Sequence, residues 1–311
     1  MGISHYIKDI GRGKDGARAL KREQARDLFG QLLDGGLSDL EVGAFCLAMR
    51  IKGETPQEMA GFLDATHARL QRLPVGAASQ RPCIVLPSYN GARKLPALTP
   101  LLALLLAREG LPVLVHGTAT ESARVRSSEV LALLGVPAWQ TMRSLGAGEV
   151  GLAPTELLLP GLKRLLDVRR VVGLRNSAHS LVKLMNPCQG PAIVVGSYTH
   201  PEYALSMAQT FELMGENALL LRGTEGEPVA DPRRQPAMDA FLAGVRQPLV
   251  AKQEGPLAVV PELPTQVDAA ATAAYTQAVL DGQLPVPAPI ATQVRQLVQL
   301  SLQLQTMKAL S

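Results

Sequence analysis

A short polar segment at residues 88–94 combines residue types that bind phosphate. It stands between an apolar run at 83–86 and a second apolar segment at 95–106. Asn-Gly is a turn signal, and hydroxyl, amide and cationic side chains beside free backbone N–H groups can hold an anion. The segment therefore predicts a phosphate-binding turn, whose contacts are Ser88, Tyr89, Asn90, Gly91, Arg93 and Lys94.

The flanking sequence predicts how this turn is positioned. Residues 83–117 are typical of one βαβ unit: a short strand, the polar turn, a buried helix within 95–110, and a returning strand that ends at His116-Gly117. In such a unit the turn after the first strand lies at the carboxyl edge of the sheet, where ligands bind. His116 and Gly117 end at the same edge and are expected to face the same anion. A histidine simply packed at a strand end is the alternative.

More cations follow this unit. Arg124 and Arg126 stand just before a helix that is expected to begin near Ser127, an arrangement suited to phosphate. The segment 155–187 reads as helix interrupted at 160–161. The spacing of its arginines indicates that they fan out along a polyanion and do not form one pincer. Its cations are Lys163, Arg164, Arg169, Arg170, Arg175 and Lys183.

The charge is unevenly distributed along the 311 residues, although the net charge is only +4. Residues 80–185 contain 13 Lys and Arg against 6 Asp and Glu, whereas residues 186–311 contain 7 against 11. Residues 1–79 are nearly balanced, with 11 against 10. The basic middle segment therefore indicates an anionic partner.

Several functional classes are excluded by their missing motifs. The sequence has no GxxxxGK[ST] and no HExxH, and its five histidines show no ligand spacing. We therefore expect no catalytic residue and no metal site of these types. Three widely spaced cysteines suggest a reduced, cytoplasmic setting, and the apolar run at 95–106 is too short to span a bilayer. No membrane partner is expected.

The chain divides into two predicted domains. Residues 1–75 are expected to be all-helical, with capping boxes at Ser38–Glu41 and Thr55–Glu58. A small-residue linker at 74–82 precedes a domain at 76–311, in which 155–185 forms a helical hinge that packs on the first domain. Strands alternate with helices in this second domain, and a short strand is expected within 258–264. The fold class is therefore α/β, with a central mixed or parallel sheet covered by helices.

Longer blocks of the sequence resemble a known family. IGRGK, MRIKGE, LPSYNGARK, VHG, GLRNSAHSL, YTHPEY and RGTEGE are similar to the YbiB-type branch of the anthranilate phosphoribosyltransferase-like (glycosyltransferase family 3) proteins. The resemblance implies a nucleoside phosphorylase/phosphoribosyltransferase-like fold over nearly the whole chain. It also implies a homodimer that forms through the helical domain at 1–75 and binds nucleic acid without sequence preference.

The sequence departs from the pattern of the enzymes in this family. Their glycine-rich diphosphate turn corresponds to Pro87–Ala92, which keeps one glycine, and their Lys-His-Gly-Asn strand end reads Val115–Thr118. Their magnesium-binding Asp-Glu pair falls on Glu227-Pro228, which leaves one remnant carboxylate. The arginine that contacts anthranilate is matched by Arg169. A magnesium diphosphate would be poorly held by such a set.

The leading hypothesis is therefore that the protein binds DNA, single-stranded above all, or RNA. This binding is expected to be independent of sequence and to need no cofactor. Aromatic residues make up only 4% of the chain, so backbone electrostatics should dominate over stacking. One alternative is phosphoribosyl transfer to anthranilate or another aromatic amine, with magnesium and phosphoribosyl diphosphate. Another is a metabolite-binding or interaction protein. The predicted groove cations are Lys8, Arg12, Lys14, Arg93, Lys94, Arg124, Arg126, Arg169, Arg170, Arg175 and Lys183.

Overall fold

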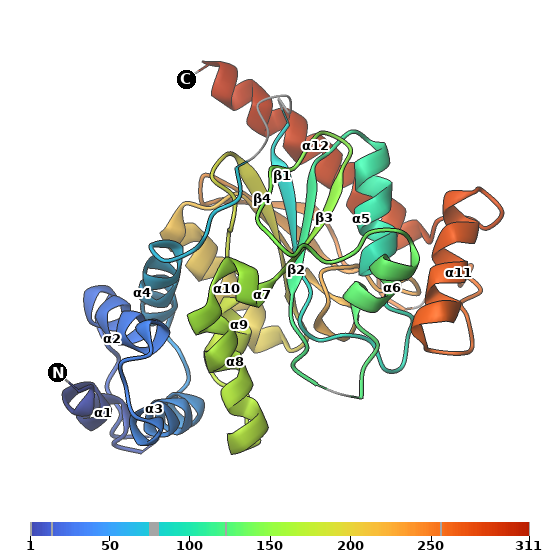
Figure 1. The fold of residues 1–311 in the computed structure, drawn as a ribbon. Coiled ribbons are helices and arrows are strands. Elements are labelled where there is room, and N and C mark those ends of the chain that lie inside the picture. Colours follow the sequence, from blue (N-terminus) through green and yellow to red (C-terminus); the bar gives the residue numbers. More distant parts are fainter. Residues whose placement is uncertain (1, 14, 75–80, 122, 256, 311) are drawn as a thin grey trace.

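The structure is a computed structural model that describes residues 2–13, 15–74, 81–121, 123–255 and 257–310. Lys14 and most of the linker predicted at 74–82 lie outside these described residues. Figure 1 shows a small group of helices at the N-terminal end, beside a larger domain built around a sheet.

The N-terminal helices pack around a cluster of three phenylalanines. Phe29 and Phe62 stack with ring centroids 4.6 Å apart, and Phe45 meets both rings edge-on. Both predicted capping boxes form, since the hydroxyls of Ser38 and Thr55 accept the backbone N–H three residues later. The helices are α1 (Ser4–Ile10), α2 (Arg22–Asp34), α3 (Asp39–Lys52) and α4 (Pro56–His67).

The larger domain contains a seven-stranded sheet in the order β3-β2-β1-β4-β5-β6-β7. Strands β1 to β5 are mutually parallel, and β6 and β7 continue the sheet as an antiparallel hairpin. The strands are β1 (Cys83–Pro87), β2 (Val113–Gly117), β3 (Val150–Pro154), β4 (Ala192–Tyr198), β5 (Ala218–Arg222), β6 (Met238–Leu242) and β7 (Val245–Val250).

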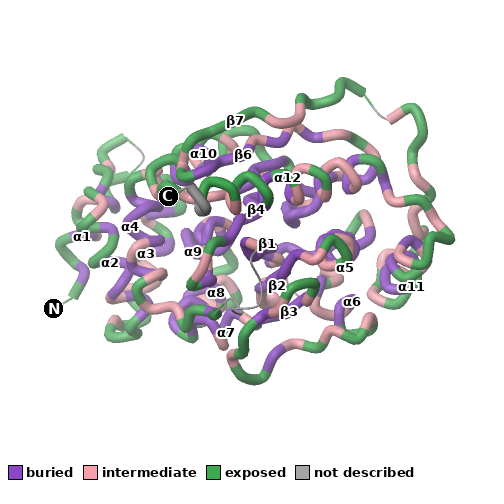
Figure 2. Tube along the Cα trace, turned by 90° about the horizontal axis from the view of Figure 1, so that it is seen from above, coloured by how far each residue is buried: buried purple, intermediate pink, exposed green. Residues whose placement is uncertain are grey.

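Both faces of the sheet are covered, because successive strand residues point to opposite sides. Ile84 belongs to the core formed with α5 (Thr99–Arg108) and α12 (Ala288–Leu310). Helices α6 (Ser127–Leu133) and α11 (Ala269–Leu280) lie next to each other at one end of the sheet (Figure 2). Val85 belongs to the other core, with α7 (Thr155–Leu158), α8 (Pro160–Val172), α9 (Ala178–Leu181), α10 (Pro201–Met214) and the N-terminal helices. In the described part of the chain, no helix is long and apolar enough to cross a bilayer.

Helix α8 joins the two domains by packing against α2. Gly161 makes this close approach possible, since a Cβ there would lie 2.1 Å from the carbonyl oxygen of Leu33. Arg164 adds a hydrogen bond of 3.0 Å from its guanidinium to the same carbonyl. The segment that carries Arg169 and Arg170 is therefore held between the helical domain and the sheet.

The predicted fold class is confirmed: a small helical domain precedes an α/β domain with a mixed sheet. Three strands escaped the sequence prediction, namely β3 and the β6–β7 hairpin. The hairpin turns through Ala243 and Gly244, which have φ of 48° and 78°, as a two-residue turn of this type requires. The strand predicted within 258–264 is wrong. Pro261 and Pro264 remove backbone donors there, and Val259 is exposed.

Candidate phosphate- and nucleic-acid-binding site

The turn after β1 lies where the order of the sheet reverses. From β1 the chain runs outward to β2 and β3 on one side, and later to β4 and β5 on the other. The carboxyl ends of two such strands leave a crevice in which ligands bind. Asn90 after β1 and Thr199-His200 after β4 line the same cleft, which has a volume of about 480 Å³.

Glu227 inserts its buried carboxylate into the turn. One oxygen accepts the backbone N–H groups of Asn90 and Gly91, at 2.7 and 2.9 Å. The other oxygen accepts from the hydroxyls of Ser88, Thr99 and Ser127. The donors that the sequence assigns to phosphate are thus already bonded to a carboxylate of the protein.

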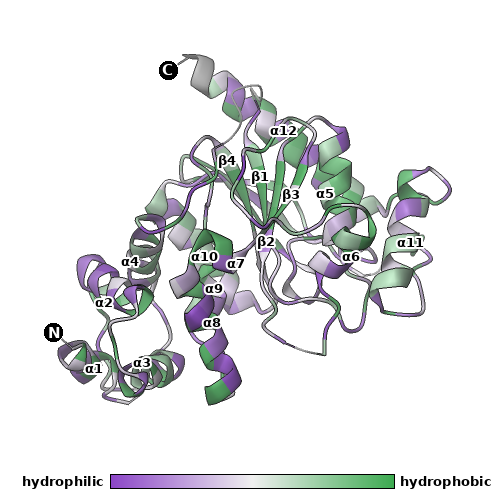
Figure 3. Cartoon of the chain, viewed as in Figure 1, coloured by the Kyte–Doolittle hydropathy of each residue, from purple (hydrophilic) through white to green (hydrophobic). Residues whose placement is uncertain are grey.

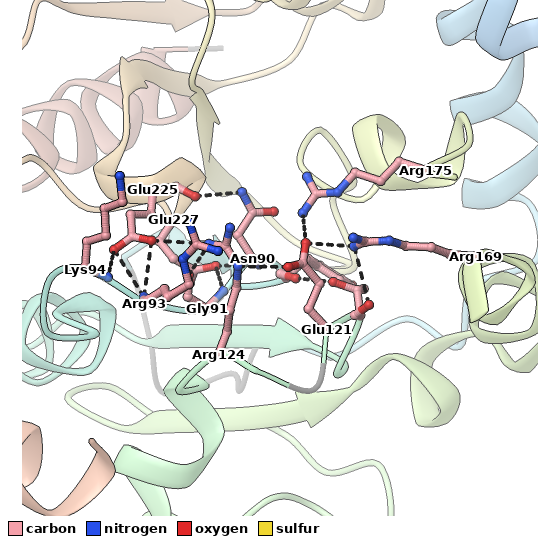
Figure 4. Close-up of polar contacts among 12 residues, drawn as sticks. Asn90, Gly91, Arg93, Lys94, Glu121, Arg124, Arg169, Arg175, Glu225 and Glu227 are labelled. Carbon is pink, nitrogen blue, oxygen red and sulfur yellow. Dashed lines mark hydrogen bonds and ion pairs between the residues drawn. The ribbon is translucent and has the colours of Figure 1, made fainter. Parts of the chain in front are cut away.

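Glu225 likewise binds the backbone of residues 93–95, the next part of the turn (Figure 4). Its carboxylate accepts the backbone N–H groups of Arg93, Lys94 and Leu95, the closest being Lys94 at 2.7 Å. Glu225 itself has φ of 52°, a conformation that is costly for a residue with a side chain. Backbone strain in the 224–226 turn is therefore offset by these carboxylate hydrogen bonds.

This arrangement does not suit a magnesium diphosphate. A divalent ion needs free carboxylate oxygens, and both carboxylates are engaged by N–H and O–H donors. Pro228 stands beside Glu227 and contributes no oxygen from its side chain. Among the described residues, no group of three or more His, Cys, Asp or Glu side chains could hold a metal ion.

Close contacts of the backbone explain two of the glycines in this region. Gly91 has φ of 67°, and a Cβ there would lie 2.8 Å from the carbonyl oxygen of Val125. Gly117 lies so close to the turn that a Cβ would come within 1.9 Å of the Ser88 carbonyl oxygen. Glycine at these two positions lets the strand ends and the turn pack together.

Tyr89 and His116 are core residues, which corrects the expectation that they reach an anion. The Tyr89 hydroxyl lies 2.9 Å from Nδ1 of His116 and accepts a hydrogen bond of 3.0 Å from Thr155. Both rings are buried. Burial lowers the pKa of His116 to about 3, so the ring is neutral and cannot act as a cation.

Three arginines converge on Glu121, in the loop between β2 and α6. Arg169 and Arg175 each approach one carboxylate oxygen at 2.8 Å, and Arg124 approaches the other at 3.0 Å. Arg124 also reaches Glu225 at 3.3 Å, which links this group to the turn (Figure 4). Partial burial raises the pKa of Glu121, but the hydrogen bonds from Arg169 and Arg175 outweigh it and lower the pKa to about 2. We call Arg124, Arg169 and Arg175 the arginine cluster.

The arginine cluster overturns the prediction that Arg169, Arg170 and Arg175 fan out. Helix α8 ends at Gly173, whose φ of 76° reverses the chain and brings Arg175 back beside Arg169. Arg170 lies 3.4 Å from Asp167 and donates to the carbonyl oxygen of Ala119, in the loop that carries Glu121, at 3.5 Å.

The other predicted site residues lie at varying distances from the cluster. The side chains of Arg93 and Lys94 are exposed on the turn. Lys183 donates to the carbonyl oxygen of Gly226 at 2.9 Å, and burial lowers its pKa to about 8. Arg126 pairs with Glu129, and Lys8 and Arg12 lie at α1, at the outer end of the helical domain in Figure 1.

Glu121 and Glu225, whose carboxylates bind the arginine cluster and the turn, were not predicted from the sequence. A weak signal was available for Glu121, because it precedes Arg124 by three residues at the end of a loop. For Glu225 the only signal was an acidic turn directly after a strand. Apart from Arg124 beside Glu121, the partners of these carboxylates lie 48 to 132 residues away, so no local pattern identifies them.

Comparisons with known proteins agree with this architecture. Residues 4–69 match the helical bundle domain of the glycosyl transferase family. The uncharacterized protein YbiB of Escherichia coli (strain K12) is 39% identical over 299 residues, covering 94% of this chain and 92% of YbiB. Anthranilate phosphoribosyltransferase of Methanosarcina acetivorans is 30% identical, covering 71% of this chain and 60% of that enzyme.

A solved structure shows the same fold. The crystal structure of anthranilate phosphoribosyltransferase from Thermus thermophilus matches 97% of this chain and 89% of that one, with a TM-score of 0.73 at 22% identity. This likeness concerns the fold alone. The chain therefore belongs to the family of YbiB, with the helical bundle domain of the glycosyl transferase family and the fold of the anthranilate phosphoribosyltransferases.

Proposed function

We propose that this protein binds nucleic acid in the cytoplasm without sequence preference, as a homodimer and without a cofactor. The observation that carries the proposal is the arginine cluster at the carboxyl edge of the sheet, next to the exposed side chains of Arg93 and Lys94. Phosphate groups prefer such guanidinium donors, and a row of cations follows a phosphate chain regardless of base sequence.

The carboxylates in the turn favour this function over phosphoribosyl transfer. Glu225 and Glu227 neutralise the backbone donors that would cradle a diphosphate, and they would repel one by charge. The side chains of the arginine cluster, by contrast, remain partly exposed, Arg124 by 19%, Arg169 by 23% and Arg175 by 34%. A phosphate chain passing over the surface can reach them without entering the turn.

Binding assays with three unrelated labelled single strands test the proposal. We expect their dissociation constants to agree within about threefold, since phosphate contacts carry no sequence information. A parallel assay with anthranilate, phosphoribosyl diphosphate and magnesium should yield no product. Product formation together with absent binding would reverse the assignment in favour of the transferase.

An apolar stripe on α3 supports the homodimer. Leu40, Leu47 and Ile51 share one helix face and are 83%, 48% and 54% exposed. The end of α8 is also coloured hydrophobic in Figure 3, and Val171 there is 88% exposed. A second copy of the helical domain would remove this apolar surface from water.

Replacing Leu47 by glutamate should convert the dimer to a monomer. A carboxylate buried without a partner in the interface costs several kcal/mol, on the order of the whole affinity of a modest dimer. Sedimentation velocity measures the change. Leu133→Glu on α6 is the matched control, because Leu133 is 60% exposed outside the stripe, and it should stay dimeric. Dimeric Leu47→Glu protein would rule out α3 as the interface.

Replacing Glu121 by glutamine should strengthen nucleic-acid binding by about fivefold. The substitution removes a negative charge that competes with phosphate for three guanidinium groups, worth about 1 kcal/mol. Glu149→Gln is the control, because this substitution removes the same charge from the ion pair between Glu149 and Arg143. Glu149 directly precedes β3, at the amino edge of the sheet, whereas the arginine cluster lies at the carboxyl edge. Fluorescence anisotropy gives both affinities. Weaker binding by Glu121→Gln would mean that Glu121 positions the arginines and does not compete with the ligand.

A further inference from the structure

The accessible Phe, Tyr and Trp rings of this protein are confined to one place. The chain has five Phe, five Tyr and one Trp. All five Phe, Trp139, and three of the five Tyr are buried. The remaining two, Tyr198 and Tyr203, both line the 480 Å³ cleft beside the turn. Stacking on any Phe, Tyr or Trp ring from solvent is therefore limited to this cleft.

The cleft is built for a small planar group. It lies between the corner joining α3 to α4 and the carboxyl end of β4, and its volume falls within the roughly 300–1,000 Å³ usual for small ligands. Its apolar lining includes Met49, Met59 and Met207, and flexible thioethers adapt to rings of different shape. Tyr203 is 38% exposed in the first turn of α10. The His200 ring lies 6.5 Å from it at 54°.

One buried polar atom in the cleft, Nε2 of His179, still lacks a hydrogen-bond partner among the described residues. Nδ1 of His179 lies 3.3 Å from the backbone nitrogen of Asn176 and 3.2 Å from its side-chain oxygen Oδ1. Burial lowers the pKa of His179 to about 4, so the ring is neutral at physiological pH. A donor or acceptor on the edge of a bound base would satisfy Nε2.

The cleft and the arginine cluster share a residue. Arg175 lines the cleft and also pairs with Glu121 beside Arg169 and Arg124. Asn90, from the phosphate turn, lines it as well. A phosphate held by the cluster therefore has the cleft as its immediate neighbour.

We propose that the cleft takes one unstacked base of a single-stranded nucleic acid, held against the ring of Tyr203, while the arginine cluster holds the adjoining phosphates. This inference rests on the proposed nucleic-acid binding and specifies its ligand as single-stranded. A duplex cannot place a base there without losing its pairing. Because every base has a π-face, one stacking site is compatible with sequence-independent binding.

Three ligands of equal length, about 15 nucleotides, separate the stacking from the phosphate contacts. They are a single strand of mixed sequence, a strand of abasic residues with the same phosphates, and the matched duplex. Wild-type protein should bind the first about tenfold more tightly than the abasic strand. Tyr203→Ala should weaken binding to the mixed strand about tenfold and leave the abasic strand unchanged. Tyr203→Phe keeps the ring and should bind like the wild type.

The outcomes distinguish base stacking in the cleft from the proposed nucleic-acid binding on which it rests. Equal binding of the mixed and abasic strands, with no effect of Tyr203→Ala, would overturn base stacking while leaving the phosphate-binding function intact. Failure of the wild type to bind any of the three ligands would overturn both. Thermal melting of Tyr203→Ala should match the wild type. Tyr203 is partly exposed, and its hydrogen bonds with His200 and Ser206 use its backbone N–H and carbonyl, which alanine keeps.

Discussion

Charge reversal of Arg93 and Lys94 to glutamate should weaken binding of single-stranded nucleic acid about 30-fold at moderate salt. The change removes two phosphate contacts and adds two repulsive charges, together worth about 2 kcal/mol. The loss should be the same for unrelated sequences, because neither residue reads a base. Fluorescence anisotropy with several labelled strands measures it.

The fold should tolerate this change. Both side chains are exposed, and Glu225 is bonded to the backbone N–H groups of these residues. Arg246→Glu with Lys252→Glu is the matched control, since it reverses two exposed charges on β7 and just beyond, at the edge of the sheet. The control variant should bind within about twofold of the wild type, as distant charges are screened. Equal losses in the two double variants would show that only net charge matters and would remove the turn from the site.

Replacing Glu227 by alanine should destabilise the protein by about 4 kcal/mol. The substitution leaves the backbone N–H groups of Asn90 and Gly91 and the neighbouring hydroxyls without an acceptor in a buried site. Each unsatisfied buried group costs about 1–3 kcal/mol. The urea midpoint of unfolding measures the change.

Two further variants show whether the carboxylate itself stabilises the turn. Glu227→Gln keeps one oxygen that can accept from the backbone, so about half of the stability should remain. Glu212→Ala on α10 removes an exposed carboxylate and should change stability by less than about 0.5 kcal/mol. A Glu227→Ala protein as stable as the wild type would contradict the assignment of Glu227 as the anchor of the turn.

Local patterns were sufficient to predict most of the fold. The run Cys83–Pro87, the buried helix before Gly110 and the strand ending at Gly117 form the predicted βαβ unit. The capping boxes at Ser38 and Thr55 start helices where the sequence places them. These features depend on residues close in sequence, which a pattern can capture. The β6–β7 hairpin was missed because its turn is Ala243-Gly244, a weaker signal than Asn-Gly or Asp-Gly.

The site was harder to predict, because it depends on contacts between distant segments. The polar turn was correctly located, but the carboxylates that bind it come from 130 or more residues later. Arg175 joins Arg169 only because Gly173 reverses the chain. Tyr89, chosen for its position in the turn, is buried by contacts with His116 and Thr155. Tyr203, which is accessible, lies in the block YTHPEY, for which the sequence predicts no contact with a ligand.

The dependence of affinity on salt tests the proposed function most directly. Each phosphate neutralised in a single strand contributes about −0.7 to the slope of log K against log salt concentration. Engagement of four or more cations from the turn and the arginine cluster predicts a slope of about −3 or steeper for the wild type. A fourfold rise in salt should then weaken binding by about 60-fold. An affinity that stays flat over that range would contradict phosphate binding by these residues.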